Sequence, residues 1–294
     1  MRTVYLGTSG FAATVLARLA DSPHRPELVI TRPDRPRGRG RRLGSPPVAD
    51  QARALGLPLA QPASVNEESA RDRIAAAGPE AICVCAFGAL IKEPLLSDYL
   101  MLNVHPSLLP RWRGAAPIER AIMAGDELTG VSIMRMTAGF DSGPVCLQEE
   151  EPIAPEDTYG SLAARLEVLG GELLVKALDE RPPCAEQDDA RVTYAEKITP
   201  EDRKLDPSRS PTELERVVRA LPPNIGAQVQ LPDGTLLGVY AARPVPGGPA
   251  PGTVSLDGRG PVLGCAGGGL ELLTVKPPGR GEMSGEAWLR GLRR

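Results

Sequence analysis

The sequence has few of the side chains that build metal centres and disulfide frameworks. It holds two histidines, His24 and His105, and five scattered cysteines in 294 residues. Two histidines cannot form a histidine-rich metal site, and an odd number of scattered cysteines predicts reduced thiols. No apolar run approaches the length of a membrane span, and the start, MRTVYLGTSGF, lacks the features of a signal peptide. These absences predict a cytoplasmic protein without a membrane segment or a bound metal.

Charge and aromatic content are also low. The formal net charge is −3 and aromatic residues make up 3% of the chain, so the charge of the whole chain predicts no nucleic-acid partner. Apolar residues make up 41%, which is enough for a sizeable core. The 32 glycines and 31 prolines indicate many turns without reaching the content of a disordered chain. The length allows two modest domains.

Strands and helices alternate through the first half of the sequence. Apolar runs predict strands at 4–6, 28–30, 81–87, 101–104 and 131–136. Helical patterns lie at 11–19, 49–55 and 162–178, and Gly170-Gly171 interrupts the last of them. The continuous run that holds Cys83 and Cys85 suits a parallel strand covered on both faces, so these thiols are assigned to the core rather than to a metal. This order predicts an α/β fold with a Rossmann-like, mostly parallel sheet over residues 1–180.

The pattern changes beyond residue 180. Residues 181–207 are polar and rich in proline, which is typical of a linker. A short helix is predicted at 211–221, and short β runs divided by glycine and proline turns follow it. Residues 208–294 are therefore predicted to form a smaller, OB-like β-barrel domain.

The segment Asn103-Val104-His105-Pro106 stands where a predicted strand ends. In open α/β sheets, ligands bind beyond the carboxyl ends of the strands, and residues two apart leave a strand on one face. Asn103 offers an uncharged donor for a carbonyl oxygen that gains negative charge. His105 offers a group that can move a proton near neutral pH. The alternative is a strand-end histidine satisfied by ordinary hydrogen bonds.

A second polar segment, Gly139-Phe140-Asp141-Ser142-Gly143, follows the next predicted strand. We expect it at the same edge of the sheet as Asn103 and His105. Its glycines allow a tight loop that directs the carboxylate inward, where it would help the imidazole act as an acid. Taken alone, such a loop is most often only a turn.

These two segments carry a resemblance to a known family. NVHPSLLPRWRGAAPIERAI together with AGFDSG closely resembles the formyltetrahydrofolate-dependent formyltransferases. The resemblance places that family's catalytic trio on Asn103, His105 and Asp141. It implies 10-formyltetrahydrofolate as the donor, with no metal. It also implies folate contacts from the following residues of this chain: Ser107, Leu108, Leu109, Pro110, Phe87, Gly88 and Leu90.

A basic segment at 32–42 bears on the second substrate. Six arginines stand there beside one acid, Asp34, and proline and glycine interrupt the segment, so it is predicted to be neither helix nor strand. A solvated loop is the alternative, but phosphate binding compensates such a concentration of charge through counterion release. The resemblance matches Arg39 to the arginine of an insertion that enters the tRNA acceptor stem. It implies a monomer that formylates initiator methionyl-tRNA and binds this RNA through Arg35, Arg37, Arg39, Arg41 and Arg42.

Three alternative functions fit the sequence less well. A formyltransferase for a small amine, such as glycinamide ribonucleotide or an amino sugar, explains the trio but not the basic segment or the β-rich tail. An RNA-binding module on an inactive scaffold predicts RNA binding without folate binding. A nicotinamide oxidoreductase needs the fingerprint Gly-x-Gly-x-x-Gly, which residues 7–12 lack. Ser107 and Ser142 lack a second histidine to activate them as nucleophiles, and His24 is expected at the surface.

Overall fold

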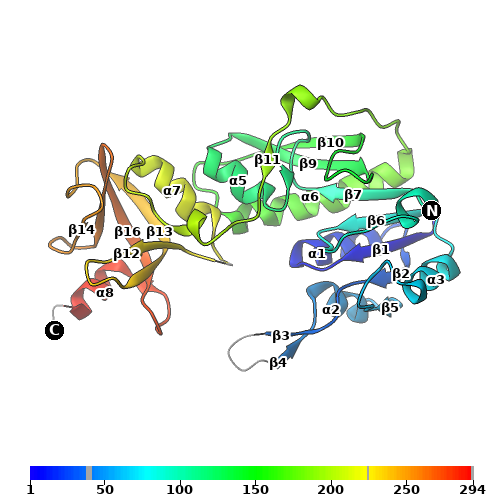
Figure 1. Cartoon of the computed structure of the whole chain (residues 1–294), viewed down its shortest axis with the longest axis horizontal. Helices are drawn as coiled ribbons and strands as arrows, with labels where there is room; N and C mark the ends of the chain where they lie inside the picture. The colour runs from blue at the N-terminus through cyan, green and yellow to red at the C-terminus, as the bar shows by residue number, and fades with distance from the viewer. Residues whose placement is uncertain (38–41, 224, 293–294) are drawn as a thin grey trace. The chain divides into compact units, whose positions relative to one another are not determined.

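The computed structural model describes residues 1–37, 42–223 and 225–292, and the chain divides into two compact units (Figure 1). The first unit contains residues 1–114, 128–152 and 163–194, and the second contains residues 115–127, 153–162 and the chain from 195 onward. Neither unit is one continuous segment. The predicted domains, which place single boundaries at 180 and 208, stay a prediction.

The first unit is built on a seven-stranded sheet with the strand order β10-β9-β7-β6-β1-β2-β5. Its strands are β1 (Thr3–Gly7), β2 (Pro26–Ile30), β5 (Leu59–Ala60), β6 (Ala81–Cys85), β7 (Met101–His105), β9 (Leu128–Arg135) and β10 (Val145–Pro152). The ladders from β7 to β5 are parallel, whereas β9 is antiparallel to β7 and β10 is antiparallel to β9. The predicted fold class, a mostly parallel sheet within an α/β unit, is confirmed.

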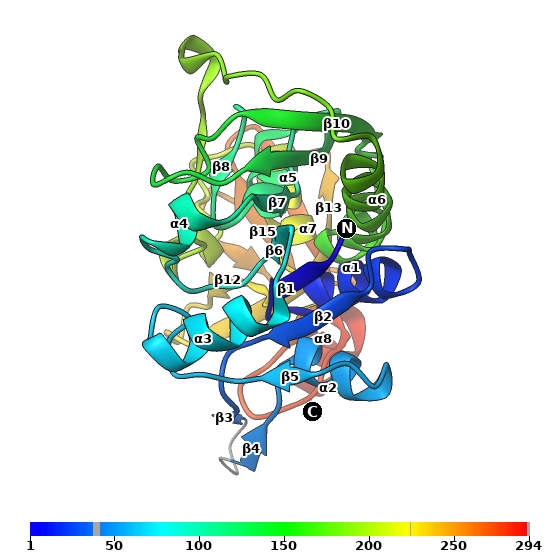
Figure 2. The same ribbon diagram turned by 90° about the vertical axis from the view of Figure 1, so that its right-hand side faces the viewer.

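Helices cover both faces of this sheet. They are α1 (Gly10–Ala20), α2 (Pro47–Ala54), α3 (Glu68–Ala77), α4 (Leu95–Asp98) and α6 (Tyr159–Glu180). Figure 2 shows α1 and α6 on one side of the sheet and α3 and α4 on the other. On the second side, Ile74 of α3 and Leu95 of α4 belong to one buried apolar cluster with Leu6, Ile82 and Met101 of the sheet. Burial on two faces explains why β6 is apolar at every position.

Helix α6 runs without a break from Tyr159 to Glu180, so the predicted interruption at Gly170-Gly171 is wrong. The two glycines allow close packing instead. A Cβ atom on Gly170 would lie 2.9 Å from Val104 Cγ1 of β7, and one on Gly171 would lie 2.8 Å from Arg18 Cβ of α1. The glycine pair therefore marks the place where α6 meets both the sheet and α1.

The basic segment contains two short strands, so the prediction that it is neither helix nor strand is also wrong. β3 (Arg35–Arg37) and β4 (Arg42–Gly44) form an antiparallel pair in which Arg37 lies opposite Arg42. A two-stranded ribbon tolerates proline in its sequence because each strand has a free edge. The pair can be followed in Figure 1.

Two expectations about single residues are wrong as well. Cys146 and Cys184 form a disulfide, because β10 and residue 185 pair next to them through the Val145–Ala185 bridge. His24 is buried rather than at the surface. One of its ring nitrogens lies 2.7 Å from the Met1 amino group and the other lies 2.7 Å from Asp179 Oδ1.

The core role of Cys83 and Cys85 is confirmed. Both side chains are buried as free thiols in β6. Burial raises the pKa of each thiol to about 12, so neither exists as a thiolate near neutral pH.

The second unit contains an antiparallel sheet with the order β12-β13-β16-β15-β14, and β17 pairs with β16. Its elements are α5 (Pro117–Ala124), the 3-10 helix η2 (Glu201–Arg203), α7 (Pro211–Ala220), β12 (Ala227–Gln230), β13 (Leu236–Val245), β14 (Val254–Ser255), β15 (Val262–Cys265), β16 (Gly268–Lys276), β17 (Met283–Ser284) and α8 (Gly285–Leu292). Leu214 of α7 and Trp288 of α8 belong to the buried cluster of this sheet. Ladders between the described residues do not join β12 to β14, so closure into a barrel stays a prediction.

An ion pair within the second unit joins α5 to η2. Arg120 donates two hydrogen bonds to the Asp202 carboxylate, at 2.7 and 3.1 Å, and Thr199 donates two more. The bonds from Arg120, with smaller contributions from Thr199, lower the pKa of Asp202 to about 2.

We expect Asp202→Asn to lower the free energy of unfolding by about 1 kcal/mol at pH 7, allowing for solvent screening of this partly exposed pair. Because folding depresses the pKa of Asp202, its contribution is present above about pH 4 and is lost as the pH falls towards 2. Urea unfolding of wild type and variant from pH 7 downward measures both effects. Asp257→Asn, at an exposed position of the same unit, is the control; a constant difference between Asp202→Asn and wild type across this range would contradict the assignment.

Among the helices of the described chain, none combines the length and the apolar character needed to cross a membrane.

Candidate functional site

The imidazole of His105 stands at the carboxyl end of β7 and is buried. Its Nε2 atom lies 2.9 Å from the carbonyl oxygen of Trp112. Since a carbonyl oxygen only accepts, Nε2 carries the proton and donates it. The Nδ1 atom faces Asp141 Oδ2 at 3.8 Å. One nitrogen is thus fixed by the backbone, and the other is turned towards a carboxylate.

The Asp141 carboxylate is largely buried, with 19% of the side chain exposed. Its Oδ2 atom accepts a hydrogen bond from the Gly114 amide at 3.0 Å. Asp141 has a positive φ of 48°, a conformation that aspartate adopts more readily than most residues. On the same loop, a Cβ atom on Gly143 would collide with the carbonyl oxygen of Arg135, so glycine is required there.

The predicted meeting of His105 and Asp141 occurs, but the expected reason for it is wrong. β9 runs antiparallel to β7, with Leu102 opposite Arg135 and His105 opposite Ser132. The loop after β9 therefore starts at the opposite end of β7 from His105. It reaches the imidazole only because residues 136–144 fold back along the sheet before β10 begins.

Asn103 lies on β7 two residues before His105 and is half-buried. Alternation along a strand places the two side chains on the same face. Within the described parts of the chain, no side-chain hydrogen bond joins Asn103 to His105 or to Asp141. The structure brings the imidazole and the carboxylate together directly, whereas the alternation of β7 places the Asn103 amide only on the same strand face as His105.

The segment after His105 returns to cover the site. Ser107 Oγ donates to the carbonyl oxygen of Arg111 at 2.6 Å. Trp112 has a positive φ of 62°, and its amide donates to Thr193 Oγ1 at 2.9 Å. A positive φ is a strained conformation for a bulky aromatic residue, and strained residues are common at functional sites. The strained turn presents the Trp112 carbonyl to His105.

The predicted folate residues occupy two segments of the first unit. Ser107 and Leu109 are buried, and Ser132 fastens them by donating to the Ser107 carbonyl at 2.6 Å and accepting from the Leu109 amide at 3.1 Å. Leu108 and Pro110, between and after them, are half-buried. This run therefore has a structural role that its sequence alone did not reveal.

The other predicted folate segment lies after β6. Phe87 is buried and its carbonyl accepts from Thr8 Oγ1 at 2.7 Å. Gly88 has a positive φ of 70°, and its carbonyl accepts from the Arg32 guanidinium at 2.6 Å. Leu90, in the same segment, is an exposed apolar residue with 68% of its surface accessible.

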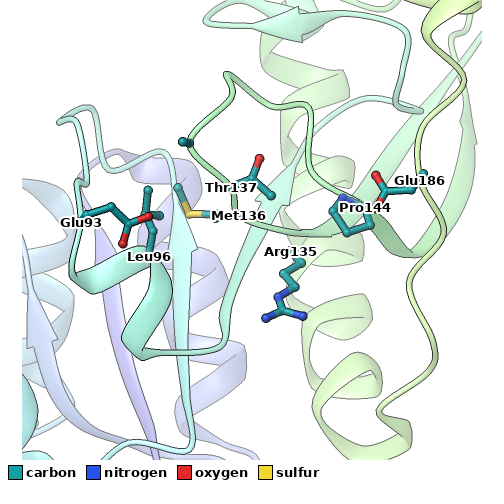
Figure 3. A pocket seen from close by; sticks show the side chains of 8 residues that line it. Glu93, Leu96, Arg135, Met136, Thr137, Pro144 and Glu186 are labelled. Carbon is teal, nitrogen blue, oxygen red and sulfur yellow. The ribbon is translucent and has the colours of Figure 1, made fainter.

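A cavity of about 380 Å³ opens beside the loop that carries Asp141. Figure 3 shows the side chains around it. It is lined by Glu93, Leu96, Arg135, Met136, Thr137, Ala138, Pro144 and Glu186. None of the predicted folate residues belongs to this lining. The cavity combines apolar walls with two carboxylates and a guanidinium, and one of its walls is the first part of the loop 136–144.

The arginines of the basic segment are only partly described. Arg35 is exposed on β3, and the backbones of Arg37 and Arg42 pair across the β3–β4 ribbon. Arg39 and Arg41 lie outside the described residues. Leu43, next to Arg42, is 74% exposed. No cluster of potential metal ligands occurs among the residues that the structure describes.

Sequence reasoning missed the residues that hold Asp141 and its loop in place. Gly114 holds the Asp141 carboxylate, and Gln187 holds the backbone of the same loop. Gly114 belongs to RWRG within the stretch of family resemblance, so a signal for it was present in the sequence. Gln187 lies in the polar segment 181–207, the predicted linker, where no motif in the sequence marks it.

Comparisons with known proteins identify the family of this chain. Residues 1–178 match the family described as formyl transferase, and residues 197–293 match the formyl transferase C-terminal domain. The chain is 40% identical over 297 residues to a methionyl-tRNA formyltransferase of Gluconobacter oxydans, covering 99% of this chain and 97% of the relative. It is 43% identical over 301 residues to a protein of the same name from Halorhodospira halophila, covering 99% and 96%.

A solved structure shares the fold. HypX from Aquifex aeolicus, solved in complex with tetrahydrofolic acid, superposes with a TM-score of 0.66 at 18% identity over 98% of this chain. This chain spans 47% of the length of HypX. At this identity the likeness shows a common fold.

Proposed function

The chain belongs to the formyltransferase family and formylates the amino group of methionyl-tRNA, and from this premise we propose that Asn103, His105 and Asp141 carry out the transfer. The observation that carries the proposal is the 3.8 Å contact between His105 Nδ1 and Asp141 Oδ2 at the carboxyl end of β7. Ligands of open α/β sheets bind at this edge. The family uses formyltetrahydrofolate, and the proposed donor is its 10-formyl form.

The cavity beside the Asp141 loop is the proposed place for the ring system of the donor. Its volume of about 380 Å³ is within the usual range for small-molecule sites. Leu96 and Met136 supply apolar walls, and the carboxylates of Glu93 and Glu186 can accept hydrogen bonds from ring nitrogens. The donor's formyl carbon supplies the electrophile.

Asn103 and His105 are proposed to stabilise the negative charge that develops on the formyl oxygen. The Asn103 amide is an uncharged donor on the same strand face as His105. In its protonated form, His105 adds a second, charged donor through Nδ1, which at 3.8 Å from Asp141 Oδ2 makes no hydrogen bond to that carboxylate. Hydrogen bonds from a charged donor are stronger than neutral ones. Asn103 and His105 would act without a covalent intermediate on the enzyme.

Asp141 is proposed to hold His105 in its protonated state during the transfer. Its Oδ2 atom faces Nδ1 of the imidazole, while Trp112 fixes Nε2 from the other side. A free α-amine has a pKa of about 7.7–8.0, so a fraction of the methionyl amino group is neutral and nucleophilic near pH 7. A water molecule beside Asp141 would carry the proton of the amine to the departing nitrogen.

Purified protein should transfer a labelled formyl group from 10-formyltetrahydrofolate to charged initiator tRNA. Uncharged tRNA and free methionine are the matched acceptors for comparison. Transfer to a small amine at the same rate, with none to methionyl-tRNA, would contradict the assigned acceptor. Because charged tRNA is the substrate, the proposed location is the cytoplasm.

We expect the triple variant Arg37→Ala, Arg39→Ala and Arg41→Ala to weaken tRNA binding and to flatten its salt dependence. A plot of the logarithm of the binding constant against the logarithm of the salt concentration has a negative slope. Each lost phosphate contact makes this slope less negative by about 0.7–0.9. Filter binding at several salt concentrations measures this slope.

A charge-matched control removes three exposed cations from the helices α1, α3 and α6: Arg18→Ala, Arg73→Ala and Lys176→Ala. The control should keep the wild-type slope. An unchanged slope in the arginine variant would remove this segment from the RNA interface.

A further inference from the structure

One side chain from a distant segment holds the backbone of the Asp141 loop. Gln187 Nε2 donates to the carbonyl oxygen of Asp141 at 2.9 Å and to that of Gly143 at 2.7 Å. These two carbonyls flank the tight turn in which Asp141 has a φ of 48°. The amide therefore spans the turn on which the carboxylate stands.

Arg113 fixes the orientation of the Gln187 amide. Its Nε atom donates to Gln187 Oε1 at 2.9 Å, and its Nη2 atom donates to Asp189 Oδ1 at 3.1 Å. The guanidinium has donors only, so the oxygen of the amide must face it and the nitrogen must face the loop. Arg113 is buried, with 5% of its surface exposed, so water competes little for these bonds.

The backbone next to Arg113 holds the side-chain carboxylate of Asp141. The Gly114 amide donates to Asp141 Oδ2 at 3.0 Å, and Gly114 has a positive φ of 135°, which favours glycine. The Arg113 amide in turn donates to the carbonyl of Thr193 at 2.9 Å. The dipeptide Arg113-Gly114 (β8) thus fixes the carboxylate directly and fixes the loop backbone through Gln187.

The segment that bears Gln187 is itself tied to the same loop. Val145, at the start of β10, exchanges two backbone hydrogen bonds with Ala185, at 2.8 and 2.9 Å. The disulfide between Cys146 and Cys184 lies beside this bridge. Gln187 follows two residues later and is half-buried, whereas its neighbours Glu186 and Asp188 are exposed. Its side chain is therefore turned inward from a segment that is otherwise at the surface.

We propose that Gln187, held by Arg113, is a positioning residue for formyl transfer: it fixes the turn 141–143 so that the Asp141 carboxylate meets His105. This inference rests on the proposed role of Asp141 and deepens it. Gln187 touches no reacting atom. Its effect reaches the chemistry only through the place and direction of one carboxylate.

Two variants of Gln187 test the proposal. Gln187→Glu keeps an oxygen for Arg113 but replaces the donor with an acceptor that faces two carbonyl oxygens. Gln187→Met has a similar length and removes the donor without adding charge. We expect both to lower kcat about 10- to 100-fold, with KM for methionyl-tRNA and the melting temperature close to wild type. The matched control is Gln51→Glu, at a half-exposed position of α2, which should retain wild-type kcat.

A double variant separates positioning from a structural role. If Gln187 acts through Asp141, adding Gln187→Met to Asp141→Asn should lower kcat by less than about twofold beyond Asp141→Asn alone. Losses that multiply would overturn the proposal, and so would a wild-type kcat in Gln187→Met. A wild-type kcat in Asp141→Asn would overturn the role of Asp141 and the inference with it. A slow Asp141→Asn with a normal Gln187→Met would overturn the inference alone.

Discussion

His105→Gln lowers kcat for formyl transfer by a factor of about 100 to 10,000, the range for the loss of a positioned acid or base. Glutamine can still donate a hydrogen bond to the Trp112 carbonyl, which His105 Nε2 contacts at 2.9 Å. It cannot take up a proton to become a cation, so it offers no positive charge to the formyl oxygen or to Asp141. Single-turnover formylation of charged tRNA measures the chemical step directly.

The second histidine of the chain is the matched control for this variant. His24 is buried between the Met1 amino group and Asp179, and in the proposed mechanism it has no role. His24→Gln should lower the melting temperature and leave the kcat of the folded protein at the wild-type value. A His105→Gln enzyme with kcat within about threefold of wild type would remove the imidazole from the mechanism.

Asp141→Asn lowers kcat by a factor of about 10 to 1,000 with little change in the Kd for tRNA. An asparagine oxygen can still accept the hydrogen bond from the Gly114 amide, now 3.0 Å from Oδ2, so the loop should keep its position. The negative charge that faces His105 Nδ1 at 3.8 Å is lost. Formylation rates and tRNA binding measured on the same preparation separate the two effects.

Asp72→Asn, at an exposed position of α3, controls for the change of charge and should leave both quantities unchanged. A near-normal turnover in Asp141→Asn would refute the assigned role. A parallel fall in tRNA affinity would instead indicate that the loop contributes to RNA binding.

The strand pattern of the first unit was predictable because buried strands consist of runs of apolar residues, which are visible in the sequence. Residues 81–85 are apolar at every position since β6 is covered on both faces. Asn103 and His105 were found because they interrupt such a pattern at the end of β7. Polar residues at the end of an apolar strand can be recognised in the sequence without knowing which other strands pair with it.

The path to Asp141 was not predictable from the same kind of signal. A strand that follows another along the chain can pair in either direction, and β9 pairs with β7 in the antiparallel sense. Direction is decided by pairing between segments, not by apolar periodicity within one of them. The meeting of Asp141 with His105 followed from the family resemblance and not from the sheet argument that accompanied it.

Long-range contacts explain the other differences. Gly170-Gly171 look like a helix break, yet a packed helix accepts glycine where side chains of other elements lie too close to leave room for a Cβ atom. Cys146 and Cys184 are 38 residues apart in sequence, and only the pairing of residues 145 and 185 makes them neighbours. In each case the decisive atoms belong to a different segment of the chain.

The sequence alone determined the class of fold, the strand that bears Asn103 and His105, and the family to which the chain belongs, because each is carried by residues close together in the sequence. Tertiary structure alone decided the direction of β9, the return of the Asp141 loop and the Arg113–Gln187 support beneath it. Those features depend on hydrogen bonds between distant segments, such as the bond between Arg113 and Asp189, which are 76 residues apart. Such bonds leave no periodic pattern in either segment, so folding had to bring the partners together before the supports of the site could be recognised.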